Sequence, residues 1–190
     1  MNNKFISFEE RFLQIRQIYV NRDVDKAISM LKEILRIDAR NYIAYKDLIS
    51  IYFREHQYEK ALEKCNEMLR FFPNDYWVYY YRGNIYMGLD KLFEAKTDYE
   101  KAYSLNHNHP ETCQNLANIF YVLEKEAIIK GYKTLPEIII ALDKIISLSN
   151  EAVRLYKKNN ADLKKYCREM VAEAEQMKNN LIIAYKAREN

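Results

Sequence analysis

The sequence predicts an all-α fold, an α-solenoid of helix–turn–helix repeats followed by long C-terminal capping helices. Apolar residues recur at three- and four-residue spacings along most of the chain, which indicates amphipathic helices. The 190 residues include only 3 Gly and 3 Pro, so few positions interrupt a helix. The pattern of large and small apolar residues also repeats when the sequence is shifted by 34 residues.

The clearest repeat spans residues 42–75 and contains two amphipathic helices. A turn at residues 54–57 separates the helices, and Pro73 ends the second one. The apolar positions are Tyr45, Leu48, Ile49, Tyr52, Tyr58, Ala61, Cys65 and Met68. Neither helix can bury its apolar face alone, so the repeat needs a neighbour on each side.

Shifting the sequence by 34 residues in each direction finds these neighbours at about 8–41 and 76–109. The small residue Ala61 becomes Ala27 in one repeat and Ala95 in the other. The first-helix pattern then continues at Cys113, Leu116, Ala117 and Phe120. This register resembles the tetratricopeptide repeat (TPR) family, whose period is 34 residues. The resemblance implies a right-handed superhelix in which the first helices line the concave face.

Arg82 departs from the repeat pattern, because its neighbours have Leu48 and Leu116 at this position. The stem of a long basic side chain can pack against apolar surface while its charge stays in water. We therefore expect the guanidinium group of Arg82 to reach solvent.

The fourth repeat, residues 110–158, is expected to carry an insertion at about residues 127–136. Its first helix should continue to about Lys130, with Gly131 beyond its end. Its second helix should run from Pro136, a residue suited to the first turn of a helix, to about Lys158, with Asn159 and Asn160 beyond it.

A final helix over residues 161–188 has apolar residues at alternating spacings of four and three. These residues are Leu163, Cys167, Met170, Ala174, Met177, Leu181 and Ala184. A heptad seam can bind a partner or a second copy of the chain, whereas a solenoid needs a cap over its last repeat. Further apolar residues widen the apolar face of this helix beyond a heptad seam, which favours its role as a capping helix. Residues 1–190 are then a single TPR domain.

The composition excludes several classes of protein. Hydrophobic residues make up 49% and charged residues 30%, as in soluble globular proteins, and a net charge of +3 gives no argument for nucleic acid. The N-terminus lacks the pattern of a signal peptide, and the apolar segment 135–148 is too short and too charged to span a bilayer. The three widely separated cysteines favour reduced thiols and a cytoplasmic location.

The sequence predicts no catalytic, metal or cofactor site. His107, His109, Glu111 and Cys113 form a single cluster without a second group of ligands at matching spacing. His56 and Cys65 lack a third residue that would orient a nucleophile and base. We therefore expect a protein that is not an enzyme.

The binding surface is expected on the first-helix faces opposite the packing positions. The candidate partner-binding residues are Phe12, Arg16, Lys46, Ser50, Phe53, Trp77, Tyr80, Tyr81, Asn84, Gln114, Asn115, Asn118 and Tyr121. Aromatic residues and Arg carry much of the binding energy in protein interfaces. We expect Trp77, the only tryptophan, to be partly exposed and to act as the central anchor. The alternative is that the long C-terminal helices cover this face.

Some TPR proteins bind acidic C-terminal peptides through a clamp of basic and Asn residues on successive first helices. By this resemblance Lys46, Asn84 and Asn118 supply part of such a clamp. The clamp is incomplete, because Phe12 replaces its first Lys, and Glu111 and Asn115 replace its last basic pair.

Three classes of function follow. The leading one is a scaffold or adaptor that binds a peptide or protein segment in the concave groove. The second is a secretion or assembly chaperone, and the third is a structural module that forms a homodimer through its final helix.

Overall fold

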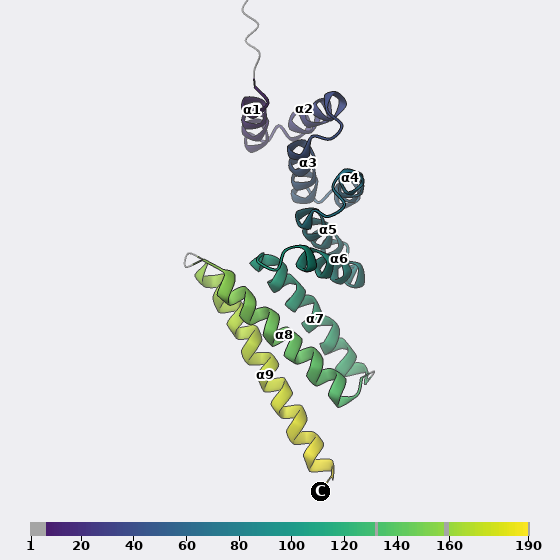
Figure 1. Ribbon diagram of the computed structural model, residues 1–190, viewed down its shortest axis with the longest axis vertical. Helices are drawn as coiled ribbons and strands as arrows, with labels where there is room; N and C mark the ends of the chain where they lie inside the picture. Colours follow the sequence, from purple (N-terminus) through teal and green to yellow (C-terminus); the bar gives the residue numbers. More distant parts are fainter. Residues whose placement is uncertain (1–6, 132, 158–159, 190) are drawn as a thin grey trace, which may run out of the picture. The chain divides into compact units, whose positions relative to one another are not determined.

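The computed structural model describes residues 7–131, 133–157 and 160–189 (Figure 1). The described residues form nine α-helices and no β-strand, which confirms the predicted all-α class. Tertiary contacts divide the chain into two compact units, residues 1–74 and 75–190. None of the described helices is long and apolar enough to cross a membrane.

The N-terminal unit contains two helix–turn–helix pairs. Its helices are α1 (Phe8–Val20), α2 (Val24–Ile37), α3 (Tyr42–Arg54) and α4 (Tyr58–Phe71). Each helix packs against the next along the chain. The small residues Ala27 and Ala61 are fully buried, as the close crossing of two helices requires. The first helix of each pair begins at a polar cap: Ser7 accepts a hydrogen bond from the Glu10 amide, and Asn41 accepts one from the Ala44 amide.

The turn inside each of the first three repeats contains one residue with a left-handed backbone. Arg22, His56 and Asp90 have φ angles of 69°, 55° and 57°. These residues are 34 positions apart in the sequence, so the repeat extends to the backbone conformation of the turn.

The C-terminal unit contains one such pair and three longer helices. Its helices are α5 (Tyr76–Gly88), α6 (Leu92–Leu105), α7 (Pro110–Lys130), α8 (Leu135–Leu155) and α9 (Ala161–Glu189). Each helix packs against the next, so that α8 contacts both α7 and α9 (Figure 1). A buried cluster joins all of these helices except α5, and Tyr80 and Tyr86 of α5 pack against it.

The ends of the long helices follow local sequence signals. Helix α7 ends at Lys130, and Gly131 caps it with a φ of 67°. Helix α8 starts at Leu135 with Pro136 in its first turn and ends at Leu155, earlier than predicted. The expected end at Lys158 and the Asn159 beyond it lie outside the described residues.

The first half of α9 packs into the C-terminal unit. Cys167, Met170 and Ala174, three residues of the predicted seam, are buried. Met177 and Leu181 pack partly buried against the same core. Helix α9 therefore covers α8, as expected of a capping helix.

The expectation for Arg82 is wrong. Its guanidinium donates two hydrogen bonds to the carboxylate of Asp98 on α6, both 2.7 Å long, and only 19% of the Arg82 side chain is exposed. Asp98 is itself buried. A buried carboxylate needs a charged partner, so the head of Arg82 turns toward the protein and away from solvent.

Candidate functional site

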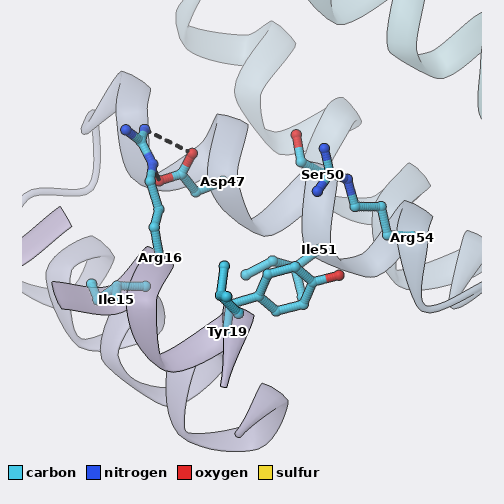
Figure 2. A pocket seen from close by; sticks show the side chains of 8 residues that line it. Ile15, Arg16, Tyr19, Asp47, Ser50, Ile51 and Arg54 are labelled. Carbon is cyan, nitrogen blue, oxygen red and sulfur yellow. Dashed lines mark hydrogen bonds and ion pairs between the residues drawn. The ribbon is translucent and has the colours of Figure 1, made fainter. Parts of the chain in front are cut away.

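In the N-terminal unit, α1 and α3 border a pocket of about 310 Å³, the α1–α3 pocket (Figure 2). Its lining residues are Ile15, Arg16, Tyr19, Val20, Asp47, Ser50, Ile51 and Arg54. Ile15 and Ile51 are buried and form apolar parts of the wall. This volume is near the lower end of the range of ~300–1,000 Å³ for ligand pockets, which suits a side chain of a bound segment.

Charged residues border the pocket at two places. Arg16 donates from Nε and Nη2 to the two carboxylate oxygens of Asp47, with both distances at 3.1 Å. Figure 2 shows this ion pair on one side, and Ser50 and Arg54 on the other. Tyr19 and Ile51 lie between the two groups (Figure 2).

Helical periodicity brings these residues together. Asp47, Ser50, Ile51 and Arg54 lie at spacings of three and four on α3, so one helix face carries all of them. Arg16 and Tyr19 are likewise three residues apart on α1. The Tyr19 hydroxyl donates a 2.9 Å hydrogen bond to Oε1 of Glu55, just beyond the end of α3. This bond fixes the Tyr19 ring at the edge of the pocket.

Of the candidate residues in this unit, the structure brings Arg16 and Ser50 together in the pocket. Phe12 is instead buried in the core of the unit, with 4% of its surface exposed. Lys46 lies over the ring of Tyr42, at 5.4 Å from its centroid. Phe53 is half-buried and contacts a tyrosine ring of α4.

In the C-terminal unit, aromatic rings gather on the candidate face of α5. The rings of Trp77 and Tyr81 are stacked with centroids 4.1 Å apart, and Tyr80 meets Tyr81 edge to face. Trp77 is half-buried, which confirms the prediction that it is partly exposed. Tyr80 also contacts the ring of His109, at a centroid distance of 4.8 Å.

The candidate amides Asn84 and Asn115 form a hydrogen-bond network inside this unit. Oδ1 of Asn84 accepts hydrogen bonds from the Tyr99 hydroxyl at 2.7 Å and from Nδ2 of Asn115 at 2.9 Å. Burial raises the pKa of Tyr99 well above its ordinary value, so this hydroxyl remains a donor. The two amides therefore link α5, α6 and α7.

The candidate residues of α7 bind the C-terminal segment of the same chain. Gln114 accepts a hydrogen bond from Tyr156, and Asn118 accepts one of 2.7 Å from Tyr166. The hydroxyl of Tyr121 donates to Glu173 at 3.0 Å. This part of the predicted groove thus follows the alternative, in which the C-terminal helices cover the first-helix face.

Arg54 and Tyr156 are not among the binding residues predicted from the sequence. Arg54 is four residues after Ser50 on the same helix face, so helical spacing could have identified it. Tyr156 directly follows α8, outside any helix or repeat position, and no sequence pattern assigns its partner.

The described residues hold no group of three or more His, Cys, Asp and Glu side chains suited to a metal ion. Burial raises the pKa of the Cys113 thiol to about 12, and Sγ donates a weak bond to the His107 carbonyl. A protonated thiol is a poor nucleophile and metal ligand. His109 caps the start of α7, where its Nδ1 accepts hydrogen bonds from Thr112.

Comparison with known sequences supports the repeat register. A family model described as "Tetratricopeptide repeat" matches residues 76–109. The chain is 24% identical over 102 residues to "Heat shock protein STI1" of Saccharomyces cerevisiae. That match covers 53% of this chain and 17% of the yeast protein, so the chain spans a small part of its relative.

Solved structures have the same fold. MamA has a TM-score of 0.57 and 15% identity, over 93% of this chain and 97% of MamA. The first TPR of Spaghetti (RPAP3), solved with the HSP90 peptide SRMEEVD, has a TM-score of 0.54 and 25% identity, over 63% of this chain and 98% of the other. Residues 76–109 therefore match a tetratricopeptide repeat, and the described part of the chain has the fold of solved tetratricopeptide-repeat structures.

Proposed function

We propose that this chain is a non-catalytic protein-interaction scaffold that binds a segment of another protein on first-helix faces of its repeats. The α1–α3 pocket carries this proposal, because it is a concave site on such a face with apolar walls and polar edges. Ligand sites in proteins typically combine an apolar lining with a few placed polar groups. The RPAP3 domain, which binds a peptide, supports the same class of function.

In the C-terminal unit, the stacked pair Trp77 and Tyr81 is the part of the candidate face best suited to a second contact. Large aromatic side chains are frequent anchors of protein interfaces. The amides of α7 contribute less, because Gln114 and Asn118 already accept hydrogen bonds from tyrosines of the chain.

The experiment uses a library of fluorescent extended heptapeptides and the full-length protein, with binding measured by fluorescence anisotropy. Ser50→Trp introduces a large ring into the α1–α3 pocket, and we expect it to weaken the best peptides at least about tenfold, the range of a lost interface anchor. The control Ser29→Trp places the same ring at an exposed position of α2 and should leave binding unchanged. Circular dichroism of both variants checks that the helices remain folded.

If no library peptide binds, or if Ser50→Trp and Ser29→Trp bind equally well, the pocket is not the binding site. The peptide SRMEEVD is a separate probe of the acidic clamp. We expect the clamp positions to contribute little to its binding, because Asn118 is held by Tyr166, and Phe12 is buried where the clamp requires a Lys.

A further inference from the structure

The charges around the α1–α3 pocket are unequally paired. Arg16 and Asp47 neutralise each other through two hydrogen bonds. Arg54 is exposed at the end of α3 and pairs with no carboxylate among the residues that the structure describes. Of the three charged lining residues, two are cationic and one is anionic, so the pocket has a net positive charge.

Tyr19 and Arg54 both line the α1–α3 pocket. Burial, followed by the hydrogen bond to Glu55, raises the pKa of Tyr19, and the charges of Arg54 and Arg22 oppose this rise. The anion beside Tyr19 is Glu55, and one of its carboxylate oxygens accepts the hydrogen bond from the Tyr19 hydroxyl. With Arg22 and Glu55 included, cations still outnumber anions by three to two around the site.

The spacing between Ile51 and Arg54 determines how far apart an aliphatic and an acidic side chain of a bound peptide must be. Ile51 and Arg54 are three residues apart on α3, and such residues have Cβ atoms roughly 5–6 Å apart. In an extended peptide, side chains i and i+2 point to the same face and are separated by about 6.6 Å. A peptide that places an aliphatic side chain against Ile51 can therefore place an acidic side chain two residues away beside Arg54.

We propose that the α1–α3 pocket selects an extended segment of a partner protein that has an aliphatic residue and, two positions away, an acidic residue. The aliphatic side chain contacts the exposed edge of Ile51, and the carboxylate pairs with Arg54. This inference rests on the proposed function and names the class of segment that the pocket binds.

The test uses full-length protein and the fluorescent peptide Gly-Ser-Leu-Gly-Glu-Ser-Gly at low ionic strength. Matched peptides carry Gln or Lys in place of Glu, or Ser in place of Leu. We expect the Glu peptide to bind about two- to fivefold more tightly than the Gln peptide, which is the range of a solvent-exposed ion pair. The preference should fall as salt is added, because salt screens exposed charges.

Charge reversal identifies the residue responsible. Arg54→Glu should make the Lys peptide bind more tightly than the Glu peptide. The control Arg70→Glu makes the same change at an exposed arginine in the last turn of α4. It should leave the order of affinities of the Glu, Gln and Lys peptides unchanged. Equal binding of the Glu, Gln and Lys peptides, or an order unaffected by Arg54→Glu, would overturn the inference.

The outcomes separate this inference from the proposed function. If library peptides bind and Ser50→Trp weakens them, but acidic peptides are not preferred, the pocket binds a segment and the charge selection is wrong. If no peptide binds the wild-type protein, both are wrong.

Discussion

At the scale of single residues, the pair Arg82–Asp98 shows how a repeat position can change its chemistry within the same fold. Neighbouring repeats have Leu48 and Leu116 at the position of Arg82, and both leucines are buried. In the third repeat, a charge on α5 faces a buried charge on α6, and the two neutralise each other. Removing one partner leaves the other buried without a counter-charge, which is more harmful than replacing both.

We expect Asp98→Ala to lower the free energy of unfolding by roughly 3–5 kcal/mol, measured by urea denaturation. The double variant Arg82→Leu/Asp98→Leu should recover most of this loss. The control Glu100→Ala removes one partner of the exposed pair with Lys96 and should change stability by less than about 0.5 kcal/mol. An Asp98→Ala variant as stable as Glu100→Ala would contradict the buried pair.

The 34-residue register correctly predicts the burial of residues when this depends on their position along their own helix. It identified Ala27, Ala61 and Ala95, all fully buried, because small residues at helix crossings recur with the period of the repeat. It failed at Phe12, which was assigned to the surface by position although a large apolar ring gains more from burial in the core. It also failed for the head of Arg82, because its partner Asp98 lies on another helix.

At the scale of helices, the start of α7 depends on one imidazole. Nδ1 of His109 accepts hydrogen bonds from the amide and hydroxyl of Thr112, and this requires an unprotonated Nδ1. Burial lowers the pKa of His109 below its ordinary value of 6.5, and the charge of Glu111 partly opposes this shift. A protonated ring would also place a positive charge at the positive end of the helix dipole.

A lowered pKa in the folded state means that the unfolded chain takes up the proton first. The stabilisation by His109 is therefore present above pH 6.5 and is lost as the pH falls below it, by at most about 1.4 kcal/mol per pH unit. We expect His109→Asn, which retains a capping side chain, to reduce the pH dependence of unfolding between pH 7 and 5. His107→Asn in the same turn is the control. Identical pH profiles for wild type and His109→Asn would refute this role.

The contacts of α7 with the C-terminal segment mark the limit of prediction from sequence at this scale. The lengthened α7 and its end at Lys130 followed from Gly131 and from the break in register. The pairing of Asn118 with Tyr166 joins residues 48 positions apart, across an insertion that has no counterpart in the other repeats. Hydrophobic periodicity identifies which face a residue occupies, and it leaves the partner across such a connection unspecified.

At the scale of the whole molecule, contacts concentrate within residues 1–74 and within residues 75–190. The interpretation of residues 1–190 as a single domain remains a prediction. Repeat proteins gain their stability from each repeat and from its nearest neighbours, so a part with a closed core can fold alone. The large buried cluster extends from Ala95 to Ala174 and lies entirely in the C-terminal unit.

We expect the fragment 75–190 to be helical by circular dichroism and to melt cooperatively. The shorter fragment 90–190 lacks α5 and exposes the residues of α6 that α5 covers, so it should lose cooperativity. Equally cooperative melting of both fragments would show that α5 is not needed for the fold of this unit. A fragment 75–190 without helix would show that the unit needs the rest of the chain.

The left-handed turns of the first three repeats are positions where substitution by glycine can raise stability. Arg22, His56 and Asp90 adopt positive φ angles although none of them is glycine. An L-residue in this conformation carries a steric cost of roughly 1–2 kcal/mol, which glycine avoids at an entropic cost of about 0.5–1 kcal/mol. None of the three residues lines the α1–α3 pocket. Glycine at His56 and Asp90 is therefore a route to a more stable scaffold that leaves the lining and the charges of the α1–α3 pocket unchanged.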